Sequence, residues 1–338
     1  MGRSTLALCD WEKRFVMGFL DHYMAGGNDY PDIKVFSDVE TLKAYVNENY
    51  IEVLLIADSF MSDEVSDLDI NKIIILSEGS VPRKYAEFPV IYKYQSSERI
   101  ISEIMNYYAD NVKEDVEYLC YKQNMRVIGV YSPVKRIGKT SFALTLGQLL
   151  GADKRVLYLN MEEYSGLTGV LGGSYKGDLL DAIFYQRRDS GNLKYKLQGM
   201  TCRLNNLDYI SPAMFSEELK NVKGSEWIEF IENIRQRMDY DVLILDMGDT
   251  VSGLTSLMEK CSVIYMPQKH DFFSQGKIMQ FEEYMRNLSK DWVTDKIIKI
   301  DLPEIACDLS GKEYLESLLE GPFVNHIKSL CMEEIGCG

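Results

Sequence analysis

Residues 138–140 read Gly-Lys-Thr, three residue types that together can bind a phosphate group. Glycine lets the backbone approach phosphate oxygens, lysine reaches the β- and γ-phosphates, and the threonine hydroxyl can ligate Mg²⁺. The tripeptide stands between the apolar run 125–132 and the amphipathic run 141–150, where a strand is followed by a helix N-terminus that favours anions. The predicted cofactor-binding residues are Lys135, Arg136, Ile137, Gly138, Lys139, Thr140 and Ser141.

Two acidic side chains follow other apolar runs and fit the same chemistry. Asp246 lies at the end of a buried run, the position of an acid that supports a Mg²⁺ ion. We expect Thr140 and Asp246 at the metal site, with Asp246 in the outer shell of the ion. Glu162 follows the run 154–160, where an acid can orient an attacking water. We predict Lys139 and Glu162 as catalytic residues. The alternative to a functional site is purely structural: Lys139 lies in an ordinary turn between a strand and a helix, and Asp246 caps a helix or turn after its strand.

The first 110 residues alternate short apolar runs with amphipathic stretches. The apolar runs are 4–9, 33–36, 51–57, 72–76 and 88–94. Helix-like stretches lie between them, for example 12–24 and 38–49. Apolar runs that alternate with helices indicate a parallel sheet with helices on both faces. Residues 1–110 therefore predict a flavodoxin-like, doubly wound α/β domain.

A second α/β series follows the charged segment 111–124, which we interpret as a linker. Its apolar runs are 125–132, 154–160, 207–212, 240–247, 262–267 and 295–302. Helical patterns separate several of them, at 141–150, 225–238 and 272–289. Residues 125–338 therefore predict a larger α/β domain with a mostly parallel sheet, and the phosphate loop follows its first strand.

The order of these motifs is similar to that of the MinD/ParA class of P-loop ATPases: Gly-Lys-Thr, then an acid after the next core strand, then the Asp246 strand. With its N-terminal domain, nearly the whole chain resembles TadZ/CpaE-type proteins, which join a receiver-like domain to a MinD/ParA-like P-loop NTPase domain. The resemblance implies binding of ATP and Mg²⁺ and nucleotide-linked homodimerisation. It also implies a localisation or assembly role in Flp/tight-adherence pili or related secretion systems, where some members are poor ATPases.

The loop departs from that family's pattern, which reads KGGxGKT. Lys135 and Arg136 replace both early glycines, Val134 replaces the lysine that crosses the dimer interface, and Pro133 stands where a general phosphate loop has glycine. Lys135 or Arg136 can take over the crossing role, or both can be solvated loop charges. The class usually has aspartate where this chain has Glu162, and the extra methylene group predicts slow hydrolysis.

The N-terminal domain has most of the residue types of a phosphorylatable receiver. Such a domain needs an acid pair after its first strand, an aspartate after the third, a hydroxyl after the fourth and a lysine after the fifth. The chain offers Asp10, Asp58, Ser77 and Lys93, with Glu12 as the remaining acid near Asp10. Because function needs the whole set, we expect a non-phosphorylated protein-interaction domain. Phosphorylation at Asp58 is the alternative.

Composition narrows the classes of partner. The chain of 338 residues has a net charge of −15, and residues 1–120 hold 11 basic against 22 acidic residues, so no nucleic acid partner is expected. No apolar run is close in length to the stretch of about 20 residues that spans a bilayer, so no membrane insertion is expected. Seven cysteines without a CxxC pair and three scattered histidines predict reduced thiols and no metal site of their own.

These observations lead to one expected function and three alternatives. We expect a cytoplasmic, ATP-binding homodimer that hydrolyses ATP slowly and binds protein partners of a pilus or secretion assembly, recruited to a cell pole or membrane-associated complex. A hydrolysis-dead scaffold is the first alternative, favoured by the lost glycines. A ParA-like DNA-partitioning ATPase is the second, and the acidic charge speaks against it. A response regulator phosphorylated at Asp58 is the third.

Overall fold

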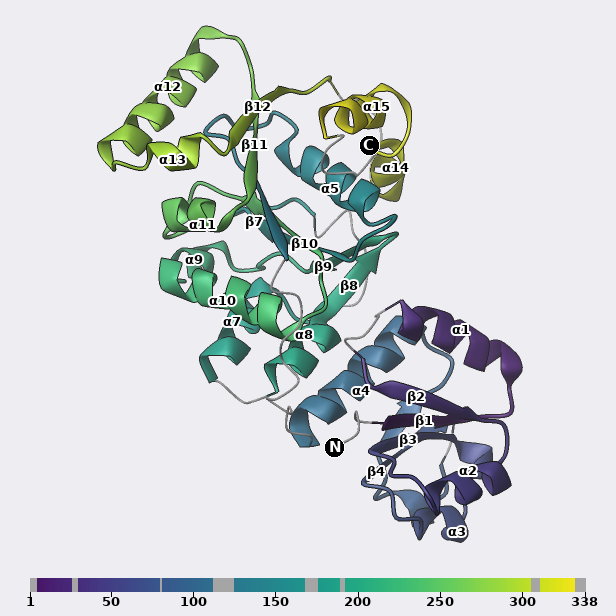
Figure 1. Ribbon diagram of the computed structural model, residues 1–338. Coiled ribbons are helices and arrows are strands. Elements are labelled where there is room, and N and C mark those ends of the chain that lie inside the picture. The colour runs from purple at the N-terminus through teal and green to yellow at the C-terminus, as the bar shows by residue number, and fades with distance from the viewer. Residues whose placement is uncertain are drawn as a thin grey trace. The chain divides into compact units, whose positions relative to one another are not determined.

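The computed structural model describes residues 5–25, 30–79, 81–111, 125–167, 176–188, 192–304 and 311–331. The chain separates into two compact units, Met1–Asn111 and Val112–Gly338, and each unit has a sheet of its own (Figure 1). Apart from Asn111, the expected linker 111–124 lies outside the described residues.

The N-terminal unit is built on a five-stranded parallel sheet. Its strands are β1 (Thr5–Cys9), β2 (Asp32–Phe36), β3 (Val53–Ala57), β4 (Lys72–Ser77) and β5 (Val90–Tyr92). Their order is β2-β1-β3-β4-β5, the flavodoxin-like order of a doubly wound sheet. The central strand β3 is buried along its whole length, whereas the edge strand β2 is largely exposed. This confirms the predicted α/β fold class for the first part of the chain.

Helices cover both faces of this sheet. They are α1 (Lys13–Met24), α2 (Val39–Val46), α3 (Asp63–Ser66) and α4 (Ser97–Asn111), with 3₁₀ turns η2 (Asp58–Phe60) and η3 (Arg83–Tyr85). Asp38 starts α2 by accepting the Thr41 amide at 2.8 Å, which satisfies one of the free N–H groups of the first turn. Leu42 of α2 and Val65 of α3 pack on one face of the sheet, while α1 and α4 contact each other.

The C-terminal unit has a seven-stranded sheet. Its strands are β6 (Arg126–Val130), β7 (Val156–Met161), β8 (Thr201–Leu204), β9 (Leu207–Ile210), β10 (Val242–Met247), β11 (Val263–Gln268) and β12 (Ile297–Asp301). The order is β12-β11-β6-β10-β7-β9-β8, and all neighbours are parallel except the hairpin of β8 and β9. The sequence did not predict β8, which turns back through Asn205 with a φ of 51°.

Two sets of helices sandwich this sheet (Figure 1). The helices are α5 (Lys139–Leu150), α7 (Leu179–Arg188), α8 (Leu193–Met200), α9 (Ser216–Lys220), α10 (Gly224–Arg237), α11 (Leu254–Lys260), α12 (Phe272–Asn287), α13 (Asp291–Thr294), α14 (Gly311–Ser317) and α15 (Gly321–Leu330). Helices α5, α14 and α15 contribute to one core cluster, and α7, α8, α10, α11 and α12 contribute to the other. Helix α5 begins two residues earlier than predicted, because Lys139 and Thr140 form its first turn.

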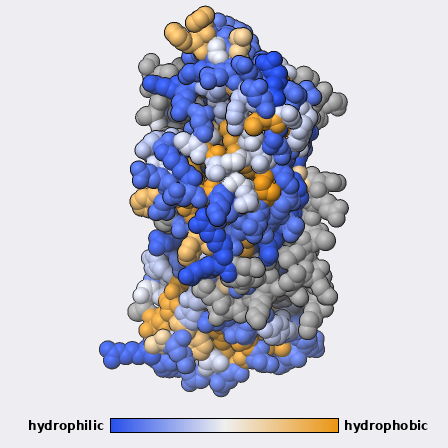
Figure 2. Space-filling view, turned by 90° about the vertical axis from the view of Figure 1, so that its left-hand side faces the viewer, coloured by the Kyte–Doolittle hydropathy of each residue, from blue (hydrophilic) through white to orange (hydrophobic). Residues whose placement is uncertain are grey.

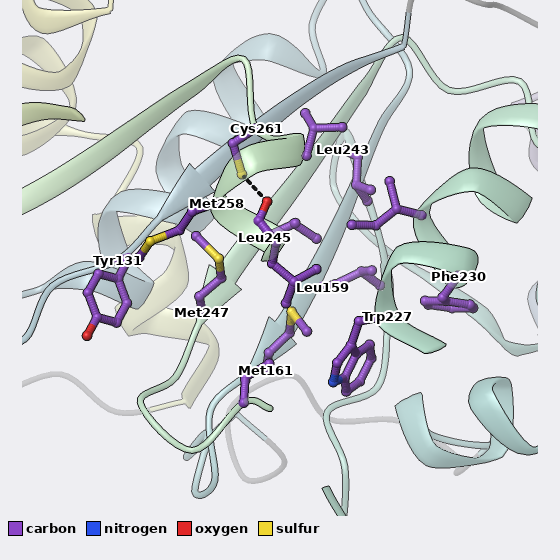
Figure 3. Packing of buried hydrophobic residues seen from close by; sticks show 14 of the residues in the cluster. Tyr131, Leu159, Met161, Trp227, Phe230, Leu243, Leu245, Met247, Met258 and Cys261 are labelled. Atoms are coloured by element: carbon purple, nitrogen blue, oxygen red, sulfur yellow. Dashed lines mark hydrogen bonds between the residues drawn. The ribbon is translucent and has the colours of Figure 1, made fainter. Parts of the chain in front are cut away.

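Strand alternation decides which side chains of β7 and β10 face the Gly-Lys-Thr loop. Leu243, Leu245 and Met247 belong to the cluster that also holds Trp227 and Phe230 of α10 (Figure 3). Their neighbours Val242 and Ile244 belong to the cluster under α5. Because side chains alternate along a strand, Asp246 faces the α5 side as well. The same alternation puts Tyr158 and Asn160 of β7 on that side.

Candidate functional site

The loop 131–138 joins β6 to α5 and is anchored by its own apolar side chains. Val134 and Ile137 are buried in the core cluster on the α10 side of the sheet. The Val134 amide donates to the Ser132 hydroxyl at 3.1 Å, and the Phe142 amide donates to the Gly138 carbonyl at 2.8 Å, which starts the helix. Gly138 has a φ of 80°, in the left-handed region that favours glycine. The loop therefore keeps a defined shape although its earlier glycines are absent.

Lys139 points across the loop to the ends of β7 and β10. Its ammonium donates to a Glu162 carboxylate oxygen and, at 2.5 Å, to the Met247 carbonyl. The nearer oxygen of Asp246 lies 3.7 Å from the same Nζ atom. The structure thus brings together both predicted catalytic residues, Lys139 and Glu162. In this structure Glu162 pairs with Lys139, the lysine that the sequence predicts to bind phosphate groups.

Thr140 and Asp246, the two residues predicted at a metal site, contact each other. The Thr140 hydroxyl donates to Asp246 Oδ2 at 2.8 Å, and the Asp246 side chain is fully buried. The other oxygen, Asp246 Oδ1, is buried without a hydrogen-bond partner among the described residues. A buried carboxylate oxygen without a partner is costly, so this atom has capacity for one more ligand.

Two further residues of β7 hold Asp246 in place. The Tyr158 hydroxyl donates to Asp246 Oδ2 at 2.9 Å, and the Asn160 side-chain amide donates to the same oxygen at 3.0 Å. Asn160 Oδ1 in turn accepts the Glu162 amide at 3.0 Å. All three donors to Asp246 meet at Oδ2, which leaves Oδ1 facing the lysine. Sequence reasoning missed Tyr158, because a tyrosine in an apolar run is usually part of the core.

Burial dominates the electrostatics of this carboxylate. It raises the pKa of Asp246 above its ordinary value, although Lys139 and the Thr140 hydroxyl pull the pKa down. Burial and the charge of Asp246 also raise the pKa of Tyr158 well above its ordinary value, so its hydroxyl remains a protonated donor. An added cation next to Asp246 would favour the charged carboxylate.

The residues present fit a Mg²⁺ ion that arrives with a nucleotide. Mg²⁺ prefers oxygen ligands and commonly takes one or two protein groups together with substrate phosphates and waters. Thr140 Oγ1 and the unpartnered Asp246 Oδ1 are oxygen atoms of that kind. Within the described part of the chain, no group of three or more His, Cys, Asp or Glu residues could hold a metal ion. The ion would therefore need phosphate oxygens to complete its shell.

The remaining predicted cradle residues differ in their partners. Lys135 is exposed, and its ammonium lies 3.3 Å from an Asp249 oxygen of the same chain. Arg136 is exposed and has a φ of 58°, a left-handed conformation that is unusual for a residue with a side chain. The Ser141 hydroxyl lies 2.6 Å from the Tyr314 hydroxyl of α14, a contact that the sequence did not predict. Among the described residues, Arg136 thus has no acidic partner.

The N-terminal unit gathers its predicted residues differently from the expected receiver pattern. Asp10, Ser77 and Lys93 are all buried. Lys93 does not bind Asp58 but contacts Asp10, Glu12 and Glu78. Asp58 instead accepts the Glu78 amide at 2.9 Å. The acid, the hydroxyl and the lysine are therefore all present, but the lysine is directed to other carboxylates.

The fold and the site together define a class: an α/β protein with a Gly-Lys-Thr loop between a parallel strand and a helix N-terminus. No protein-family model and no curated protein sequence matches the chain significantly. Among the helices that the structure describes, none is long and apolar enough to cross a membrane.

Three solved structures illustrate the similarity of this chain to known proteins. A plasmid partition protein from Borrelia burgdorferi B31, bound to AMPPNP, is 15% identical, with a TM-score of 0.46 over 63% of this chain and 100% of that one. A ParA family ATPase from Chlorobium tepidum TLS is 18% identical, with a TM-score of 0.47 over 62% and 99% of the two chains. A Cyanothece McdA–ATP complex is 16% identical, with a TM-score of 0.43 over 63% and 81%.

Proposed function

We propose that the C-terminal unit binds ATP with Mg²⁺ and uses the nucleotide as a switch. The observation that carries this proposal is the pair of Thr140 and the buried Asp246, next to Lys139 at the start of α5. A threonine hydroxyl, a carboxylate oxygen without a partner and an ammonium meet where the first-turn amides of a helix are free. A purely structural turn has no need of this combination of buried charges.

Each residue of the site has a separate role in this proposal. The amides of Gly138 and the first turn of α5 hold the phosphate oxygens, and Lys139 neutralises them. Thr140 would hold the Mg²⁺ ion, with Asp246 in its outer shell, and the bound ion would withdraw charge from the phosphates. Tyr158 and Asn160 orient Asp246 by their hydrogen bonds to Oδ2.

Glu162 would change partner when a nucleotide binds. It now accepts a hydrogen bond from Lys139, the group that the phosphates need. Phosphate oxygens would displace the carboxylate, which could then orient a water for attack. When Glu162 is released, its ion pair with Lys139 is lost. The side chain of Glu162 is also longer than that of aspartate and positions a water less firmly. The proposal therefore includes slow ATP hydrolysis.

Exposed apolar side chains support a nucleotide-dependent homodimer. Tyr164 follows β7, Phe215 follows β9, and Phe272 and Phe273 follow β11, with 86% and 78% of the last two residues exposed. Because these strands are parallel to β6, all of these residues lie at the same end of the sheet as the phosphate loop. Figure 2 shows one side of the molecule, where hydrophilic residues predominate and apolar residues form smaller areas among them. Apolar residues around a site are suited to contact with another protein surface.

At the level of the cell, we propose a cytoplasmic localisation or assembly factor for a Flp/tight-adherence-type pilus or a secretion system. A receiver-like domain of residues 1–110 would bind protein partners, and an ATPase domain of residues 125–338 would control the dimer. Recruitment to a cell pole or a membrane-associated complex would follow from those partners. The net charge of −15 favours this role over DNA partitioning, because DNA would repel the chain.

A nucleotide-independent scaffold is the second candidate, and one observation favours it. Lys139 already has an acidic partner, so this lysine is electrostatically satisfied without phosphate. Calorimetry with ATP and Mg²⁺ on the wild type and on Lys139→Ala, with light scattering of both, separates the two functions. Binding and dimer formation by the wild type alone support the switch. Absence of wild-type binding at millimolar ATP would select the scaffold.

A further inference from the structure

Helix α12 exposes more apolar surface than an ordinary solvent-facing helix. It packs on the sheet through its buried residues Ser274, Ile278, Phe281 and Met285. We call its exposed middle residues the outer side of α12: Gly276, Lys277, Met279, Gln280, Glu283 and Tyr284. Met279 and Tyr284 are 65% and 54% exposed, whereas α10, a helix of similar length whose residues the structure describes in full, exposes no large apolar side chain. Apolar residues gathered on one exposed helix are suited to contact with another protein surface.

This apolar surface continues well beyond the end of the sheet that carries the Gly-Lys-Thr loop. Phe272 and Phe273, in the first turn of α12, lie at that end and belong to the proposed nucleotide-dependent dimer. By the rise of an α-helix, Tyr284 lies about 18 Å further along the axis than Phe272. Helix α12 stands at an outer edge of the C-terminal unit and contacts α13 (Figure 1). A dimer contact around the nucleotide therefore does not explain why Met279 and Tyr284 are exposed.

Two opposite charges on the outer side of α12 are left without a partner. Lys277 and Glu283 are both exposed, and neither forms an ion pair with any residue that the structure describes. They do not pair with each other, because only residues three or four positions apart face each other on a helix. Glu282, in contrast, pairs with Lys299 of β12 at 2.6 Å. The unpaired lysine precedes Gln280 by as many residues as the unpaired glutamate follows it.

The same surface of a second copy, running antiparallel, complements all of these features. When two α12 helices meet at Gln280, Lys277 of each chain lies level with the partner's Glu283, so both facing pairs have opposite charges. Gly276 lies level with the partner's Tyr284 and leaves room for the ring, since no atom lies within 4 Å of where a Cβ atom of residue 276 would stand. A parallel pair would instead place like charges side by side, which is unfavourable.

We propose that the outer side of α12 binds the outer side of α12 of a second copy, in an antiparallel pair that forms without nucleotide. One pair of helices buries less than the roughly 1,200 Å² of a stable complex, so the contact is weak, with a dissociation constant on the order of 100 μM. At the lower concentrations used for light scattering it is largely dissociated and does not mask an ATP-dependent step. The inference does not depend on nucleotide binding by the C-terminal unit.

Sedimentation equilibrium of the full chain without nucleotide tests the inference through charge reversal. We expect Lys277→Glu and Glu283→Lys each to self-associate about tenfold more weakly than wild type, because both facing charge pairs become repulsive. An equimolar mixture of the two variants should associate about as tightly as wild type, because the facing charges are again opposite. Glu229→Lys is the matched control: it makes the same change in net charge on the exposed surface of α10 and should leave the association unchanged.

Gly276→Gln tests the close approach of the two helices. It should raise the thermal midpoint of the chain, because glycine is unfavourable within an exposed helix, and the added side chain meets no neighbour within the chain. The same variant should lose self-association, because its side chain keeps the helices apart.

Three results would overturn the inference. A wild-type chain that stays monomeric at about 1 mM would exclude the contact. A mixture of Lys277→Glu and Glu283→Lys that associates no more tightly than either variant alone would exclude the antiparallel pair. Wild-type association that persists unchanged in Gly276→Gln would place the contact elsewhere on the chain.

Discussion

The Thr140 hydroxyl donates a hydrogen bond to the Asp246 carboxylate, 106 residues further along the chain. This contact joins the first turn of α5 to the end of β10, the central neighbour of both β6 and β7. It is possible because Asp246 falls on the α5 side of an alternating strand, with Val242 and Ile244. The candidate site therefore depends on strand register as much as on the loop itself.

The first prediction concerns Tyr158, which holds Asp246 without belonging to the phosphate loop. Tyr158→Phe removes one donor to Oδ2 and keeps the ring packing. We expect a loss of about 1–2 kcal/mol in unfolding free energy, and weaker ATP binding only when Mg²⁺ is present. Titrations of the protein with ATP, with and without Mg²⁺, measure the change in ATP affinity, and denaturant unfolding measures the change in stability.

Tyr240→Phe is the matched control for that experiment. It removes a buried tyrosine hydrogen bond of 3.1 Å to Asp208, away from the phosphate loop. We expect a similar loss of stability and unchanged ATP binding. Equal effects of both variants on Mg²⁺-dependent binding would show that Tyr158 has only a structural role.

The sequence predicted the features that depend on local pattern. Apolar runs followed by helical stretches predicted the parallel sheets, and the Gly-Lys-Thr context predicted the helix start to within two residues. The place of Asp246 near the end of a buried strand was predicted as well, while its role at a metal site stays a prediction. These predictions succeed because strand burial and helix entry are visible in the order of residue types.

Other features could not be predicted because they depend on contacts between distant segments. Tyr158 is an ordinary core residue by pattern, and only the register of β7 with β10 brings it to Asp246. Strand β8 holds only two apolar residues, Cys202 and Leu204, so it did not stand out as an apolar run, and it pairs antiparallel with the edge of β9. The place of Lys93 after the fifth strand was visible in the sequence. Its ion-pair partners were not, because they depend on how distant segments pack in the folded chain.

The second prediction concerns pH. The pKa of Asp246 is raised in the folded protein, mainly by burial, so its contribution to stability is complete below the unfolded pKa of about 3.9 and is lost as pH rises through the folded pKa. Asp246→Asn is neutral at every pH. Without nucleotide, we expect this variant to gain stability relative to wild type as pH rises through the acidic range. Denaturant titrations at several pH values measure the difference.

The same variant should lose the metal. Asp246→Asn removes a negative charge from the proposed Mg²⁺ site, and we expect Mg²⁺-dependent ATP binding to weaken by about 10–100-fold. Parallel pH profiles of stability for the two chains would contradict the raised pKa. Unchanged Mg²⁺ dependence would contradict the metal assignment.

The third prediction concerns the contact between Lys139 and Glu162. Glu162→Gln removes the anion that competes with phosphate for the lysine. We expect ATP to bind about fivefold more tightly, from an ion pair of about 1 kcal/mol, while phosphate release becomes slower. Glu163→Gln is the matched control, since among the residues that the structure describes Glu163 pairs only with the surface Lys220, at 2.5 Å. Unchanged ATP affinity in Glu162→Gln would show that this carboxylate does not compete with the nucleotide.

The last prediction separates backbone strain from charge at Arg136. Because glycine adopts a φ of 58° without strain, Arg136→Gly should stabilise the unit by about 1–2 kcal/mol. If the exposed guanidinium reaches the partner's nucleotide, the same variant should still bind ATP but lose ATP-dependent dimerisation in light scattering. Lys135→Ala is the control, because Lys135 already pairs with Asp249 of its own chain. A dimer that survives Arg136→Gly but not Lys135→Ala would assign the crossing role to Lys135 instead.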